Sequence, residues 1–141
     1  MEELKKLKAR YESVCQAHAC LVEALELLDT YDTYDVLYRH IRSSAIQSFE
    51  FTIDTFWKFI KEYMAYKNHT VIENPSPRKI FLEAAAQGFI PKNMLPAFLR
   101  MIDDRNLTSH TYREILANEI RDRLPEYCRL LDIVLGQIKV T

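Results

Sequence analysis

Apolar residues in the first part of the chain recur at spacings of three and four, with polar residues between them. The positions in this register are Leu4, Leu7, Tyr11, Val14, His18, Leu21, Leu25 and Leu28. Steps of three or four keep such side chains on one face of an α-helix. The pattern predicts a helix of about 28 residues that is buried along one side.

A polar cluster at residues 29–33 is predicted to end this helix and to cap the next one. The second helix is expected over about residues 34–66, because another apolar stripe runs through that range. Its members are Ile41, Ala45, Phe49, Ile53, Phe56, Ile60 and Tyr63, with Trp57 beside them. These two helices are the longest that the pattern predicts.

Serine, proline and glycine mark the limits of a short third helix. Residues 67–77 form the main connection of the chain, and they end in Ser76 and Pro77. Serine is a favourable N-cap and proline suits the first helical position, so this pair predicts a helix N-terminus. Gly88 is placed to end the helix, since glycine readily adopts the left-handed backbone that follows a helix.

Two further helices complete the expected fold. The fourth follows Pro91 and Pro96, and the last is expected over residues 111–138, kinked by Pro125 because proline lacks a backbone N–H. Five helices, two of them near 30 residues, predict an all-α, single-domain antiparallel bundle over residues 1–141.

Composition agrees with this fold and limits the function. The 141 residues are 48% hydrophobic and 28% charged and include only two glycines, which suits helices better than a β-sandwich. A formal net charge of −1 excludes a general nucleic-acid binder, so any RNA contact must be local or shared between subunits. The first residues lack an apolar signal core, and no stretch approaches the roughly 20 apolar residues of a membrane span. We expect a cytoplasmic protein without membrane contact.

The cysteines suggest no metal site. Cys15, Cys20 and Cys128 are an odd number and are expected as reduced thiols. Cys15 and His18 share a helix face, but Cys20 does not join them, and zinc normally needs a fuller set of ligands. We expect His18 in the seam of the first helix, at a dimer contact, and no bound metal.

The segment DDRNLTSHTY, residues 103–112, carries the most unusual polar side chains. It continues the stripe of the fourth helix, which reads Met94, Phe98, Met101, Arg105, Thr108 and Tyr112. Asn106 and His110 lie four residues apart on the neighbouring face, where their side chains can meet. Thr111 and Glu114 form a capping-box pattern, so the helix is either continuous through the segment or broken before Thr111. The sequence leaves both versions open.

Arginine and histidine together suit cleavage of RNA without a metal. Imidazole acts as acid or base near neutral pH, and guanidinium holds two phosphate oxygens and stabilises transition-state charge. We therefore take Arg105 and His110 as candidate catalytic residues, with Asn106 orienting the phosphate or the histidine. The motif holds one histidine per chain, which does not serve as acid and base at once, so a homodimer with facing motifs is expected. The alternative is a structural polar cluster satisfied inside the bundle.

Two acidic residues are candidates for supporting roles. Glu50 lies beside the apolar stripe of the second helix, where its carboxylate is placed to pair with an arginine of a neighbouring helix, Arg105 in particular. Asp104 is expected to form a salt bridge or to interact with the helix dipole, as is Asp103. Neither is expected to bind a metal.

The motif and its surroundings resemble a known family. Residues 105–112 resemble the signature of the HEPN superfamily: an arginine, four residues, a histidine, one residue and a tyrosine. The wider chain is similar to the nucleotidyltransferase substrate-binding subfamily. The matching segments, in order, are IQSFEF at 46–51, WK at 57–58, SPR at 76–78 and DRN at 104–106.

This resemblance implies a HEPN-like helical homodimer that acts as a metal-independent endoribonuclease toxin of a prokaryotic toxin–antitoxin module. Its active site would combine Arg105 and His110 from both subunits, and its substrate would be mRNA or tRNA. The resemblance also implies a minimal nucleotidyltransferase antitoxin that uses ATP to attach AMP to Tyr112, so this chain itself would need no cofactor. The alternative is a non-catalytic substrate-binding subunit of a nucleotidyltransferase complex.

Overall fold

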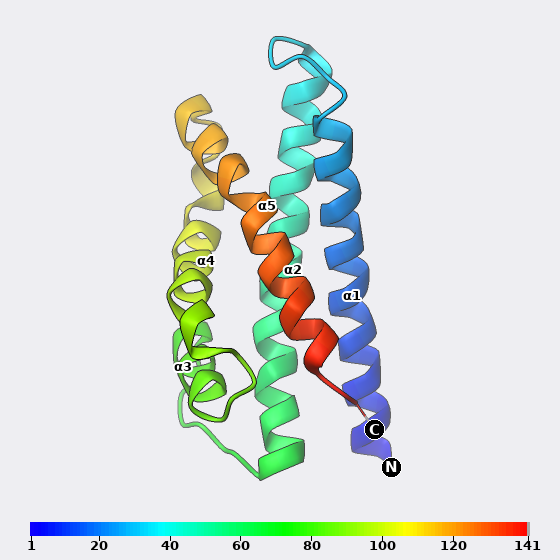
Figure 1. Cartoon of the computed structure of the whole chain (residues 1–141), viewed down its shortest axis with the longest axis vertical. Coiled ribbons are helices and arrows are strands. Elements are labelled where there is room, and N and C mark those ends of the chain that lie inside the picture. Colours follow the sequence, from blue (N-terminus) through cyan, green and yellow to red (C-terminus); the bar gives the residue numbers. More distant parts are fainter. Residues whose placement is uncertain (141) are drawn as a thin grey trace.

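The computed structural model describes residues 1–140 as an antiparallel bundle of helices (Figure 1). Its elements are α1 (Glu2–Leu28), α2 (Val36–Asn68), α3 (Pro77–Ala86), the 3-10 turn η1 (Lys92–Met94), α4 (Leu95–Leu107), the 3-10 turn η2 (Thr108–His110) and α5 (Glu114–Gln137). The predicted all-α bundle with two helices near 30 residues is confirmed, since α1 has 27 residues and α2 has 33. No helix within residues 1–140 is long and apolar enough to cross a membrane.

α1 and α2 pack against each other along the length of the molecule (Figure 1). The predicted seam of α1 is fully buried at Leu7, Val14, Leu21 and Leu28. α2 begins slightly later than expected, because Asp35 rather than a residue of 29–33 forms its N-cap. The Asp35 side chain accepts a hydrogen bond from the Leu37 N–H at 2.9 Å. Asp32 is used in the preceding turn, where it accepts from the Tyr34 N–H.

α2 is the central helix and contacts each of the other four. α3 and α4 lie on its side away from α1, while α5 crosses from the end of α4 back toward α1 (Figure 1). Phe56 of α2 has its ring centroid 5.7 Å from those of Phe81 in α3 and Phe98 in α4. Phe49 stacks on Tyr127 of α5 at 5.6 Å. These buried rings fix α3, α4 and α5 relative to α2.

The predicted limits of α3 are confirmed. The Ser76 hydroxyl accepts a hydrogen bond from the Lys79 N–H at 3.2 Å, and Pro77 occupies the first turn. After the helix, Gly88 adopts a φ of +83°, a conformation in which a side chain would be strained. The Phe89 N–H then donates back to the carbonyl of Ala84 at 2.9 Å, which closes the helix end.

The chain leaves the helical path between α4 and α5, so the broken version of the motif is the correct one. α4 ends at Leu107, η2 forms one tight turn, and α5 begins at Glu114. This α4–α5 junction, residues 108–113, lies toward the same end of the bundle as the α1–α2 connection (Figure 1). The polar motif is therefore divided between a helix end and a surface turn.

The predicted capping box at the start of α5 is wrong. The Thr111 hydroxyl donates to the Thr108 carbonyl at 2.9 Å, and α5 begins after Arg113 with no side-chain cap. Glu114, which would complete the box, binds Arg42 of α2 instead. The Glu114 carboxylate, which the local pattern predicts in the cap, therefore forms a long-range ion pair instead.

Candidate functional site at the α4–α5 junction

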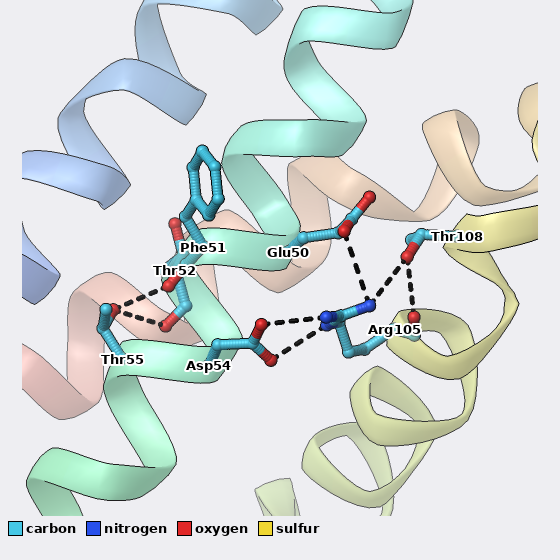
Figure 2. A network of polar contacts seen from close by, with 7 residues as sticks. All are labelled: Glu50, Phe51, Thr52, Asp54, Thr55, Arg105 and Thr108. Atoms are coloured by element: carbon cyan, nitrogen blue, oxygen red, sulfur yellow. Dashed lines mark hydrogen bonds and ion pairs between the residues drawn. The ribbon is translucent and has the colours of Figure 1, made fainter.

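Arg105, in the last turn of α4, points toward α2 and binds two carboxylates there (Figure 2). Its Nε and Nη2 donate to the two oxygens of Asp54, both at 2.9 Å, and its Nη1 lies 3.4 Å from Oε2 of Glu50. Nη1 also donates to the Thr108 hydroxyl at 3.1 Å. The hydrogen bonds to Asp54 raise the pKa of Arg105. This fork of donors is the part of arginine that otherwise holds two phosphate oxygens.

The contact between Glu50 and Arg105 is the one expected from the sequence, whereas Asp54 was missed. Glu50 and Asp54 are four residues apart on α2, so their carboxylates lie on one face of the helix. Like charges at this spacing repel each other unless a cation lies between them. The spacing is therefore the signal that would have identified Asp54 as a second partner of an arginine.

Asp104 is directed at α5 rather than α2. It is 3% exposed and accepts hydrogen bonds from Nε and Nη2 of Arg123, both at 2.7 Å, and from the Tyr127 hydroxyl at 2.6 Å. Burial, together with the bond to Asp104, raises the pKa of Tyr127 to about 12. The predicted salt-bridge role of Asp104 is thus realised as a buried network that joins α4 to α5. Neither of its partners was predicted.

Asn106 faces another part of the surface. It lines a groove of about 320 Å³ between α3 and α4, together with Ser76, Arg78 and Asp103. The expected meeting with His110 depends on a continuous helix, and α4 ends at Leu107. The four-residue spacing therefore no longer places the two side chains on one face.

His110 and Tyr112 are exposed on the junction. Their ring centroids are 6.3 Å apart, with the ring planes at 68°. Tyr112 is 82% exposed. The side chains of the motif are thus separated: Arg105 is paired with α2, Asp104 is buried against α5, and the rings of His110 and Tyr112 are exposed.

A second arginine, missed from the sequence, holds the other end of the junction. Arg42 of α2 is 4% exposed and donates to both carboxylate oxygens of Glu114, at 2.9 and 3.2 Å. It also donates to Oδ1 of Asn118 at 2.7 Å. The hydrogen bonds from Arg42 lower the pKa of Glu114. Arg105 before the junction and Arg42 after it both attach the junction to α2.

His18 and Cys128 take structural positions. His18 Nε2 lies 2.9 Å from the carbonyl oxygen of Cys128 and 3.4 Å from its Sγ, so this histidine contacts α5 of its own chain. Burial raises the pKa of Cys128 to about 11, which disfavours the reactive thiolate. Within residues 1–140, His, Cys, Asp and Glu side chains form no group of three or more that would hold a metal ion.

Known proteins resemble this chain over most of its length. The family model described as "Nucleotidyltransferase substrate binding protein like" matches residues 9–140. A crystal structure of a Thermus thermophilus protein is similar with a TM-score of 0.66 and 36% identity, covering 83% of this chain and 97% of that one. The structure of HI0074 from Haemophilus influenzae gives a TM-score of 0.68 and 23% identity, covering 95% and 97%. A comparison with curated proteins gives no match.

The expectation of a ribonuclease is wrong. The matching family is one of substrate-binding proteins, and the HI0074 structure is described as the fold of a substrate binding domain of a nucleotidyltransferase. The geometry is consistent with this correction, because the guanidinium of Arg105 is bound by carboxylates of its own chain. The roles expected of Asn106 and His110, the homodimer and the modification of Tyr112 stay predictions.

Proposed function

The chain belongs to the nucleotidyltransferase substrate-binding-like family, and on this premise we propose that it is the substrate-binding subunit of a nucleotidyltransferase complex. In this role the chain binds the acceptor molecule, while a separate subunit binds ATP and supplies the catalytic groups. The observation that carries the proposal is the family match over residues 9–140. The use of Arg105 and Arg42 to hold helices together also favours a binding role over a catalytic one.

We propose that the nucleotidyltransferase docks on the α4–α5 junction. Large apolar side chains are exposed on and beside this turn: Tyr112 is 82% exposed and Ile115 is 77% exposed. Exposed aromatic and aliphatic groups that lie close together are typical of protein interfaces. The ion pairs of Arg105 and Arg42 hold the turn at both ends, which lowers the entropy lost when a partner binds it.

Co-expression with the nucleotidyltransferase of the same genome tests this function. With an affinity tag on one protein, we expect the two to purify together and to elute as one species in size-exclusion chromatography. A folded chain that elutes alone after mixing with the nucleotidyltransferase at tens of micromolar would contradict the proposal, because that concentration exceeds the dissociation constant of all but weak complexes.

A second function for the same surface is favoured by the exposure of the Tyr112 side chain. We propose that the nucleotidyltransferase transfers AMP to this side chain. The phenolic oxygen attacks the α-phosphorus of ATP and forms a P–O bond, while the bond between the α- and β-phosphates breaks and pyrophosphate leaves. The phenolic proton passes to a base of the nucleotidyltransferase. The added group places a negative charge and a bulky nucleotide on the α4–α5 junction.

Intact mass spectrometry after co-expression tests the transfer. We expect an AMP-sized addition to the wild-type chain and none to Tyr112→Phe. Tyr34→Phe is the matched control, because Tyr34 is also highly exposed and should leave the addition unchanged. An addition that persists in Tyr112→Phe would assign the acceptor to another residue.

A further inference from the structure

A groove beside the α4–α5 junction has the size of a small-molecule site. It has a volume of about 510 Å³ and lies between the α1–α2 connection, α2 and the first turns of α5. Small-molecule sites in proteins typically enclose roughly 300–1,000 Å³. Its lining includes Tyr31, Tyr38, Arg42, Asn118, Arg121 and Asp122. Glu114 also lines it, two residues after Tyr112, so the groove adjoins the surface assigned to the nucleotidyltransferase.

Two arginines in the wall of this groove keep an unused hydrogen-bond donor. Among the buried side-chain nitrogens and oxygens of residues 1–140, only Nε of Arg42 and Nε of Arg121 lack a partner. Buried donors are nearly always paired, because an unpaired one forfeits its bonds to water. Both atoms belong to side chains that line the groove, so their N–H signals report on a ligand bound there.

Tyr38 adds a phenol to the same wall. Its side chain is 5% exposed, and it lines the groove. Asn118 uses its carbonyl oxygen to accept from Arg42, which leaves its amide N–H groups for a ligand. Tyr31 lines the groove as well and offers an aromatic face. Donors and apolar ring surface therefore occur together.

The charges of the groove largely cancel one another. Arg42 binds Glu114 at 2.9 Å, and Arg121 lies 3.6 Å from Asp29 and 3.4 Å from Asp122. Three carboxylates against two arginines leave a small negative excess, which repels a phosphate group. Carboxylates accept hydrogen bonds from sugar hydroxyls, as acidic residues do from ribose in dinucleotide sites. The chemistry thus fits an uncharged ligand with several hydroxyl groups.

We propose that this groove binds an uncharged nucleoside-like molecule, with its adjacent hydroxyls on the carboxylates and arginines and its flat face on the tyrosines. That this ligand is the acceptor substrate rests on the proposed function. The binding itself belongs to the isolated chain and requires no partner. The position of the groove next to Glu114 brings the ligand to the edge of the α4–α5 junction.

Nuclear magnetic resonance of the isolated chain tests the proposal. Adenosine, guanosine, cytidine and uridine are titrated to millimolar concentrations, while the Nε–H signals of Arg42 and Arg121 are followed. We expect at least one nucleoside to shift these signals saturably and its 2′,3′-dideoxy analogue to bind at least roughly 10-fold more weakly, since two hydroxyls are lost. The corresponding 5′-monophosphate should also bind more weakly than the nucleoside.

Two matched variants locate the site. Tyr38→Phe removes only a hydroxyl and should weaken binding roughly 3- to 10-fold. Tyr66→Phe makes the same change in a separate groove beside His69 and should leave binding unchanged. The proposal is overturned if none of the four nucleosides shifts the arginine signals, if the monophosphate binds more tightly, or if Tyr38→Phe has no effect. Complex formation with the nucleotidyltransferase is measured separately, so failure of this groove leaves that test intact.

Discussion

A buried carboxylate joins α4 to α5. Asp104 accepts three hydrogen bonds of 2.6–2.7 Å from two side chains of α5 and is itself buried. A buried carboxylate is stable only with such partners, because removal from water otherwise strongly disfavours its charge. Its neighbour Asp103 is exposed. Two adjacent aspartates therefore differ greatly in how much they contribute to stability.

Asp104→Asn should destabilise the fold by roughly 2–4 kcal/mol, because Arg123 loses its counterion and a single amide oxygen is left to accept from Arg123 and Tyr127. This loss of unfolding free energy is smaller than is usual when a fully buried ion pair is broken, because the side chain of Arg123 is 34% exposed. Urea unfolding followed by circular dichroism measures the difference. Asp103→Asn is the matched control and should change stability by less than about 0.5 kcal/mol. Equal effects of the two substitutions would contradict the assigned role of Asp104.

Two buried acids of α5 make stability fall at alkaline pH. Burial raises the pKa of Cys128 from 9.0 to about 11 and that of Tyr127 from 10.0 to about 12. The folded chain holds these protons more tightly than the unfolded chain, so the stabilisation is complete below pH 9 and is lost as the pH rises from 9 to 12. We expect the unfolding free energy to drop by roughly 2–4 kcal/mol over this range.

Urea unfolding at about pH 8.5 and about pH 11.5, on either side of most of this range, measures the drop. Cys128→Ala separates the contribution of the thiol. In that variant the loss of stability between the two pH values should be smaller than in the wild type. An identical pH dependence in both proteins would show that the thiol is not the titrating group.

The partners of these residues could not be predicted from local spacing. Asp104 is 19 residues from Arg123 and 23 from Tyr127, and Arg42 is 72 residues from Glu114. Helical periodicity identifies which face a side chain occupies, but it does not identify the residue opposite it. Glu50 was expected to pair with an arginine of a neighbouring helix, Arg105 in particular, and the structure shows this contact.

At the scale of elements, periodicity and caps predicted the helices well. The register of α1, the cap of α3 at Ser76 and the glycine after α3 all follow from local chemistry. The start of α5 was misplaced, because the local capping box competes with an ion pair to Arg42. Local rules thus fail where a long-range contact uses the same side chain.

The two ion pairs to α2 should govern the mobility of the α4–α5 junction. The double variant Asp54→Asn and Glu114→Gln removes one carboxylate charge at each end while keeping side-chain size. We expect amide hydrogen exchange in residues 108–113 to accelerate about 5- to 20-fold, because weakening these contacts favours local opening. Exchange in the core of α2 should change little.

Glu62→Gln is the matched control for this experiment. Glu62 pairs with Arg10 at 2.7 Å on the α1–α2 surface, far in sequence from the junction. Loss of the Glu62 charge should leave amide hydrogen exchange in residues 108–113 unchanged. Equal acceleration in both variants would mean that the junction responds to overall charge rather than to its two ion pairs.

At the scale of the molecule, the two ends of the bundle differ in surface. The α4–α5 junction presents Tyr112, with Ile115 beside it in α5, while the α2–α3 connection at the opposite end (Figure 1) includes the exposed Val71. If the nucleotidyltransferase docks on the junction, Tyr112→Asp with Ile115→Asp should weaken the complex at least roughly 100-fold, because buried aromatic and aliphatic anchors dominate interface energies. Val71→Asp should leave the affinity unchanged.

Isothermal titration calorimetry with the purified nucleotidyltransferase measures these affinities. Both altered residues of the double variant are exposed, so its fold should be preserved, and circular dichroism checks this. A complex weakened by Val71→Asp but not by the double variant would move the interface to the other end of the bundle.

The position of α5 near the C-terminal end of the chain also determines when the groove and the junction are complete during synthesis. α1 and α2 are adjacent in sequence and pair directly, so they can associate while the ribosome is still translating later segments. The groove beside the junction takes Glu114, Asn118 and Arg121 from α5, which is made after the other four helices. A nascent chain that already holds the α1–α2 pair therefore has one wall of the groove but lacks the carboxylate that fastens the junction to Arg42. On the proposals made for the groove and the junction, binding of ligand and partner begins only once α5 has emerged and docked.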